Sequence, residues 1–263
     1  MRRKLMTALA LSAVLAVSVA AVASATQTTI LAGNLKLTFG GTVSPKALPK
    51  STYTPVSSTI FGKIETTDGT HPSAFREAEV NIDKNVKVNV KGFPVCKGGQ
   101  LEARDTNAAM KVCGSTVLGK GIAHVEIAFP EQKPIVVSSP LTIFNGGEKG
   151  GKVTLYFHIF ITVPVPAAIV TTVTVQKKGT GIHSIAKVPV AVGGSGSALD
   201  FSFKLGKTYS YKGKKVGYFE AKCPTGAFNT TTKALFKNEA HIPGVAATTT
   251  LQGKLSVPCT PKG

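Results

Sequence analysis

The residues best suited to direct chemistry lie in one short segment, residues 68–73, which reads Asp-Gly-Thr-His-Pro-Ser. This segment contains the three residue types of a nucleophilic triad. Such catalysis needs a histidine that a separate, buried carboxylate holds and that is aimed at the nucleophile. The chain also lacks a Gly-x-Ser-x-Gly turn, because Ser195 has no second glycine at the required spacing. We therefore interpret residues 68–73 as a solvated turn and assign no catalytic residue.

Residues 146–152, Gly-Gly-Glu-Lys-Gly-Gly-Lys, match most of a phosphate-binding loop. The next residue is Val153, so the hydroxyl that would bind magnesium is missing. A strand is expected to follow, so no helix N-terminus would face a phosphate. We predict a glycine-rich hairpin turn here and no cofactor.

Metal binding would need several ligands close together. His124 and Glu126 share one face of an expected strand and could supply two ligands, whereas His158, His183 and His241 occur singly. We predict no metal site. Paired carboxylates for glycan hydrolysis stay open as an alternative, which the absence of Trp and the presence of only five Tyr weaken.

The basic charge is the strongest signal in the sequence. Lys and Arg number 31 against 13 Asp and Glu, which gives a formal net charge of +18. Lysines and tyrosines cluster in one stretch, and we predict that this stretch binds polyanions; the residues are Lys204, Lys207, Lys212, Lys214, Lys215, Lys222, Tyr209, Tyr211 and Tyr218. Beyond residue 25 only Arg76 and Arg104 are arginines, so we expect diffuse attraction without specific nucleic-acid recognition. The alternative is a charge excess that only keeps the protein soluble.

Residues 1–25 have the features of a secretory signal peptide. Arg2, Arg3 and Lys4 precede an apolar run, and Ala23-Ser24-Ala25 is a small-x-small cleavage site. Cleavage there would lower the net charge of +18 by three, to +15. A retained membrane anchor is the alternative. We predict a secreted or envelope-associated protein.

Export determines how the cysteines are interpreted. In an oxidising compartment the four cysteines favour disulfides over zinc, and no Cys-x-x-Cys spacing occurs. Three connectivities are open. We favour Cys96–Cys113 and Cys223–Cys259, because each pair is nearest in sequence.

The texture of the chain predicts an all-β fold, an antiparallel β-sandwich with one or two short helices. Segments rich in Val, Ile, Thr, Phe and Tyr alternate with turns, and a helix is expected at about residues 105–112. Hairpin turns are expected at residues 83–85 and 212–214. The uncharged run 153–175 has Pro164 and Pro166 at its centre, so it predicts two buried strands and no transmembrane segment. We expect one domain, residues 26–263, with an alternative boundary between two lobes near 145–152.

The layout resembles a group of uncharacterised secreted bacterial proteins with four cysteines. The residues that carry the resemblance are turn and disulfide segments, namely residues 61–64, 68–72, 92–96, 144–146 and 223–226 together with Cys259. The resemblance implies no activity and no site residues.

The sequence therefore favours an exported, non-enzymatic protein that associates with anionic polymers or with the cell envelope. A secreted hydrolase of glycans or esters, with a site assembled from distant segments, is one alternative. A structural envelope or assembly protein is another.

Overall fold

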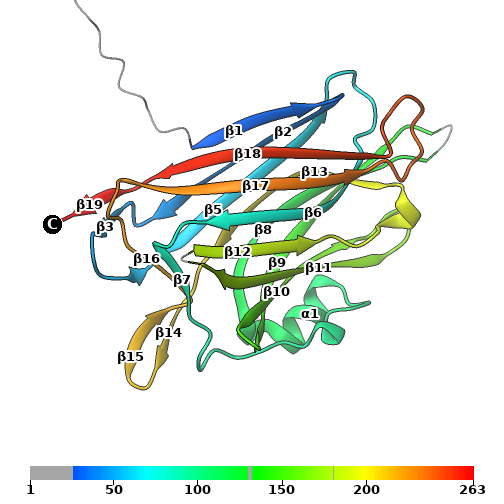
Figure 1. Ribbon diagram of the computed structural model, residues 1–263. Coiled ribbons are helices and arrows are strands. Elements are labelled where there is room, and N and C mark those ends of the chain that lie inside the picture. Colours follow the sequence, from blue (N-terminus) through cyan, green and yellow to red (C-terminus); the bar gives the residue numbers. More distant parts are fainter. Residues whose placement is uncertain (1–25, 130–131, 180) are drawn as a thin grey trace, which may run out of the picture.

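Most of the chain belongs to one long antiparallel sheet (Figure 1). The computed structural model describes residues 26–129, 132–179 and 181–263, so the expected signal peptide, residues 1–25, lies outside the described residues. In chain order, the strands of this sheet are β1 (Gln27–Ala32), β2 (Leu35–Ser44), β5 (Ser57–Thr66), β6 (Ala74–Ile82), β8 (Val117–Ile127), β9 (Ile135–Lys149), β10 (Lys152–Ile161), β11 (Ala167–Lys178), β12 (Gly181–Lys187), β13 (Gly196–Leu205), β17 (Ala227–Lys237) and β18 (Thr248–Pro258).

This sheet coils until its two edges meet. Its strand order is β1-β2-β5-β13-β8-β9-β10-β11-β12-β6-β17-β18. The edge strand β18 lies beside β1 and β2, and a Cβ atom placed at Gly253 would lie 3.2 Å from the side chains of Ile30 and Phe39. The inner face of the coiled sheet therefore surrounds an enclosed interior.

The shorter strands form three small sheets beside the large sheet. β4 (Thr54–Pro55), β16 (Phe219–Ala221) and β7 (Val86–Val88) form a small sheet, and β19 (Thr260–Lys262) pairs in parallel with β3 (Ala47–Pro49). β14 (Thr208–Tyr211) and β15 (Lys214–Gly217) form a hairpin that projects from the large sheet (Figure 1).

The expected all-β, antiparallel fold is confirmed. Its helical content is α1 (Thr106–Cys113) and the short 3-10 turns η1 (Gly98–Gln100), η2 (Gly114–Thr116) and η3 (Val192–Gly194). The Asp105 carboxylate caps α1 by accepting a hydrogen bond from the Ala108 N–H at 2.8 Å. What differs from a simple sandwich is that a single continuous sheet supplies both facing layers.

Two sequence interpretations of the central segment are confirmed. The uncharged run 153–175 forms β10 and β11, which pair with each other on either side of the prolines at 164 and 166. Residues 146–152 contain the expected glycine-rich hairpin turn, in which Gly150 and Gly151 separate the end of β9 from the start of β10. No helix among the described residues has the length and apolar character needed to cross a lipid bilayer.

The expected hairpin at residues 83–85 is wrong. β6 precedes this turn, but β7 pairs with β16 and not with β6. The Asp83 carboxylate accepts hydrogen bonds from the Asn85 N–H and from the Asn229 N–H of β17. These contacts hold the turn against β17 while the chain leaves the large sheet.

The predicted disulfides are both present. Cys96–Cys113 joins the segment before η1 to α1, and Cys223–Cys259 joins the chain after β16 to the end of β18. Each half-cystine is buried. The two bonds belong to separate apolar clusters. Cys96–Cys113 packs with Phe144 at the outer face of the sheet, and Cys223–Cys259 packs at one end of the body, next to Val86 and Phe219.

Candidate functional site

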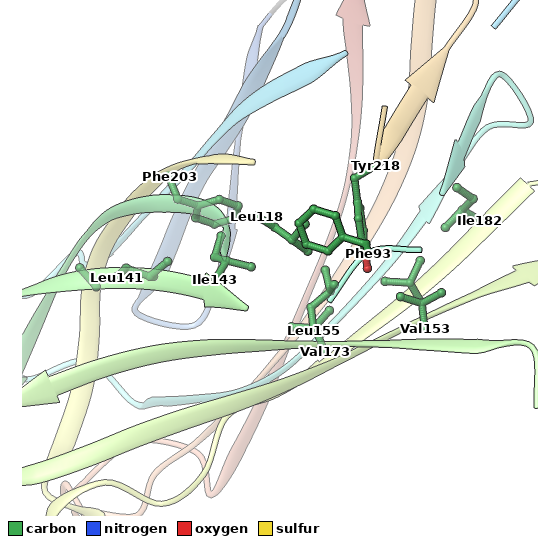
Figure 2. Close-up of a cluster of buried hydrophobic side chains, with 12 residues drawn as sticks. Phe93, Leu118, Leu141, Ile143, Val153, Leu155, Val173, Ile182, Phe203 and Tyr218 are labelled. Atoms are coloured by element: carbon green, nitrogen blue, oxygen red, sulfur yellow. The ribbon is translucent and has the colours of Figure 1, made fainter. Parts of the chain in front are cut away.

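The interior of the coiled sheet contains an apolar cavity of about 330 Å³. Strands β5, β6 and β8 to β13 form its wall, with β7 and β16 at one end. Figure 2 shows part of this wall, where Leu141, Leu155, Val173 and Phe203 project from different strands toward a shared interior.

The cavity runs along the direction of the strands. One end is lined by Val86, Val88, Leu205 and Phe219, where the β14–β15 hairpin leaves the body. The other end is lined by Arg76 and by the loop after β12, including Val188, Pro189 and Ala191.

The side chains of the wall do not fill this interior. Phe157, Ile159 and Phe201 all face the cavity, yet they are only partly buried. Small residues make further room, because Ala78 of β6 and Ala186 of β12 are direct partners and both line the cavity. A closely packed core would bury such side chains completely.

Polar groups on the wall are few. Among the described lining residues the only charged side chains are Arg76 and Asp200, and the hydroxyls are those of Thr171 and Ser184. Arg76 forms a two-pronged pair with the Glu239 carboxylate and also donates to the Pro189 carbonyl. The Asp200 carboxylate lies 2.7 Å from His124 Nδ1. The wall is therefore apolar, and both of its charges have partners.

No protein-family model, curated protein or solved structure matches this chain. The resemblance to secreted four-cysteine proteins therefore stays a prediction.

The lysines of the predicted polyanion surface are exposed, with Lys222 partly so. Lys207, Lys212, Lys214 and Lys215 lie on or beside the projecting hairpin (Figure 1). Lys204 lies on β13, directly opposite Lys120 of β8. The structure thus divides the predicted cluster between the hairpin and the outer face of the sheet.

The tyrosines of this cluster fasten the hairpin to the body. The Tyr209 hydroxyl donates to the Lys91 carbonyl at 2.9 Å, and the Tyr211 ring packs on the backbone of Gly92. Tyr218 is fully buried, its hydroxyl donates to Asn145 Oδ1 at 2.7 Å, and burial raises its pKa. Assigning Tyr218 to a surface site was therefore wrong, because its ring belongs to the core beside Phe93 (Figure 2).

The residues of segment 68–73 do not assemble a triad. Asp68 accepts hydrogen bonds from the Thr70 hydroxyl and N–H and from Asn34, which hold its pKa at about 2. His71 instead pairs through Nδ1 with Glu126 at 2.6 Å. The Ser73 hydroxyl is buried and has no hydrogen-bond partner among the described residues, so no contact joins a nucleophile to a base.

The other residues that the sequence offered for phosphate or metal binding lie in a turn or pair with another side chain of the protein. Residues 146–152 comprise the end of β9, the expected glycine turn at residues 150–151 and the start of β10. His124 and Glu126 each have a separate partner, Asp200 and His71. Within the described part of the chain, no group of three or more His, Cys, Asp or Glu side chains is placed to hold a metal ion.

Sequence reasoning missed the cavity. Residues such as Phe157 and Ile159 alternate along a strand in the same way whether they face a core or a hollow. The nearest signal was run 153–161, which carries no Lys, Arg, Asp or Glu on either face of the strand, but this run shows only that the strand is covered on both sides.

Proposed function

We propose that this protein is an exported, non-catalytic binding protein that holds an apolar small molecule inside its coiled sheet. The observation that carries this proposal is the apolar cavity of about 330 Å³. Its volume lies within the range of about 300–1,000 Å³ that is common for small-molecule sites.

The energetics favour a ligand over a permanent void. Side chains that border an unfilled apolar space have no contact atoms on that side and lose the corresponding dispersion energy. A bound apolar molecule restores the missing dispersion contacts and removes much of this cost.

Water is a poor alternative occupant, because an ordered buried water needs about two to four polar partners. The wall offers mostly aliphatic and aromatic side chains. A cavity of about 150 Å³ holds benzene, so by proportion this one fits a molecule with on the order of a dozen heavy atoms. Medium-length alkyl compounds and small terpenoids have this size.

Titration with the uncharged fluorescent probe 1-naphthylamine, a molecule of about a dozen heavy atoms, tests the proposal. We expect saturable binding with one site per chain. Ala186→Phe places a phenyl ring in the cavity, where it takes the space of part of the probe. Because the probe then loses the apolar contacts of about one ring, binding should weaken by about tenfold or more. Ile185→Phe is the matched control, because Ile185 is the neighbouring residue of β12 and does not line the cavity.

A second readout guards against misfolding. At a free probe concentration of a hundred times its Kd, binding should stabilise the wild-type protein by about 2.7 kcal/mol. The melting temperature of the wild-type protein should rise accordingly. That of Ala186→Phe should not rise. Binding that never saturates, or that Ala186→Phe leaves unchanged, would refute an interior site.

We also propose, as a second function, that the lysine surface attracts anionic polymers or envelope surfaces. The observation in its favour is that Lys204 and Lys120 are direct cross-strand partners, an arrangement that costs stability through like-charge repulsion. Within the described residues, neither of them nor any lysine of the hairpin forms an ion pair.

Elution from an anionic resin at increasing salt tests this second function. Replacing Lys207, Lys212, Lys214 and Lys215 by Gln should lower the eluting salt concentration. Replacing Lys149, Lys152, Lys177 and Lys178 removes the same charge from other exposed positions and serves as the control. Equal shifts for both variants would show that net charge alone, and no surface of the hairpin, determines retention.

A further inference from the structure

We infer that the cavity selects uncharged ligands over carboxylic acids of the same chain length, and that Glu239 sets this preference by occupying Arg76. This inference rests on the proposed binding of an apolar ligand and names the chemical class of that ligand.

Arg76 is the only positive side chain among the described residues that line the cavity. It lies near the start of β6, at the end of the cavity that Pro189 and Ala191 close. In a site for fatty acids, an arginine at this place would bind the ligand carboxylate, because the guanidinium fork matches two carboxylate oxygens.

Here the protein supplies that carboxylate itself. Arg76 Nε donates to Glu239 Oε1 at 2.8 Å, and a second nitrogen of the guanidinium donates to Glu239 Oε2. A third donor reaches the Pro189 carbonyl. The exposed fraction is 9% for the Arg76 side chain and 22% for the Glu239 side chain, so the guanidinium is the better shielded of the two.

The fold fixes Glu239 in this position. Glu239 belongs to the loop between β17 and β18, and it packs against the η3 turn, where a Cβ atom on Gly194 would lie 3.2 Å from the Glu239 Cβ. Gly194 has a φ of 99°, a conformation that side chains other than glycine rarely adopt. The two loops that meet at this end of the cavity therefore hold the carboxylate on the guanidinium.

Asp200, the negatively charged residue of the wall, also has a partner within the protein. The Asp200 carboxylate pairs with His124 Nδ1. A charged ligand would therefore find no free counter-charge on the wall, and burial of an unpaired charge in apolar surroundings is costly. An uncharged ligand carries no such cost, so the occupied Arg76 acts as a filter against acids.

Competition with the bound probe by decanol and decanoate near neutral pH tests the inference. Both molecules have the same chain length and differ in charge. Wild-type protein should prefer decanol by about tenfold or more. Glu239→Gln leaves Arg76 charged but without its carboxylate, so decanoate should bind about tenfold better while decanol changes little.

Two further variants isolate the cause. Glu77→Gln removes the same charge from the adjacent position of β6, which does not line the cavity, and should leave the preference unchanged. The double variant Arg76→Gln/Glu239→Gln has neither charge, so decanoate should again bind poorly. If its decanoate affinity instead equalled that of Glu239→Gln, Arg76 would not be the group that binds the acid.

The outcomes separate this inference from the proposed function. Equal affinities of the wild-type protein for the two competitors would overturn the selectivity while leaving the binding site in place. An unchanged preference in Glu239→Gln that still binds the probe would do the same. Failure of the wild-type protein to bind any of the three compounds would overturn both.

Discussion

The two faces of strands β9 to β11 are packed very differently. On the outer face Phe144 and His158 are fully buried under a layer that includes α1 (Figure 1) and the Cys96–Cys113 disulfide, and Leu101 and Ala109 of this layer are fully buried as well. On the inner face Ile143 and Leu155 are buried too, but Phe157 and Ile159 remain partly exposed beside the cavity, although they belong to the same strand as His158. The incomplete packing of the inner face is therefore concentrated around Phe157 and Ile159.

This difference has a mechanical consequence. A sheet whose interior is incompletely packed lacks support from within, so its shape must be held from elsewhere. Helix α1, the disulfide and the buried aromatic side chains support β9 to β11 from outside. We interpret this outer layer as the support that keeps the cavity wall in place, which explains why residues 153–161 carry no Lys, Arg, Asp or Glu on either face of the strand.

A pair of phenylalanine variants gives the largest expected effects. Phe144→Ala opens a hole in the dense outer layer and should lower the free energy of unfolding by about 3–5 kcal/mol. Phe157→Ala, on the adjacent strand, should cost only about 1–2 kcal/mol, because its ring already borders the hollow and loses fewer contacts. Urea denaturation measures both. Equal losses would contradict the difference in packing.

Removing the outer disulfide should have the next largest effect. Cys96→Ala/Cys113→Ala opens a loop of 17 residues and should cost about 3 kcal/mol. Because this disulfide supports the cavity wall, affinity for the fluorescent probe should also fall. Cys223→Ala/Cys259→Ala should cost a similar amount, but this bond packs in another cluster, which reaches the cavity only at the end lined by Val86 and Phe219, so its loss should lower probe affinity less. Probe affinity that falls equally in both would contradict a supporting role specific to Cys96–Cys113.

Local signals in the sequence predicted several elements well. The Asp105 cap, the hairpin around Gly213, the strands on either side of Pro164 and both cysteine pairs depend on neighbouring residues or short loops. The turn at residues 83–85 was predicted as a hairpin because its flanking segments alternate. Which strand β7 joins depends on β16, more than a hundred residues away, and no local pattern encodes that partner.

The candidate site could not be predicted from the sequence for a related reason, because it depends on contacts between residues that are far apart in the chain. Tyr218 was grouped with lysines that are its neighbours in sequence, whereas its ring lies beside Phe93 in the core. The pairing of Arg76 with Glu239 joins residues 163 positions apart, and the cavity exists only because the edges of a twelve-stranded sheet meet. One sequence shows which side chains are apolar, but it does not show whether they fill the space that they enclose.

On the outer face, His158 makes stability depend on pH. His158 is fully buried, its Nε2–H donates to the Arg104 carbonyl at 2.9 Å, and burial lowers its pKa below the ordinary value of about 6.5. As the pH falls below about 6.5, the unfolded chain takes up a proton that folded His158 resists. Stability should therefore fall by up to about 1.4 kcal/mol per pH unit from this group.

His158→Gln keeps a donor for the Arg104 carbonyl and removes the titrating group. The difference in unfolding free energy between the wild-type protein and this variant should change as the pH falls from neutral to about 5. His241→Asn, which replaces an exposed histidine, should show the wild-type pH dependence. A wild-type pH dependence in His158→Gln as well would mean that other groups cause the acid sensitivity.

The smallest expected effect concerns the inner face, where Ser184 interrupts the apolar wall. Its cross-strand partners Val175 and Val80 also line the cavity, and its hydroxyl has no hydrogen-bond partner among the described residues. Ser184→Ala should therefore change stability by no more than about 1 kcal/mol, since no hydrogen bond within the protein is lost.

Ligand binding gives a second readout of Ser184. A ligand whose hydroxyl bonds to Ser184 should bind about threefold to tenfold more weakly to Ser184→Ala. Decanol should accordingly bind more weakly to Ser184→Ala, while an alkane of equal length is unaffected, and Ser210→Ala on the exposed hairpin should change neither. Equal effects on the alcohol and the alkane would mean that the inner face recognises its ligand by shape and apolar contact alone. The outer face, in contrast, holds His158 by a hydrogen bond to the Arg104 carbonyl.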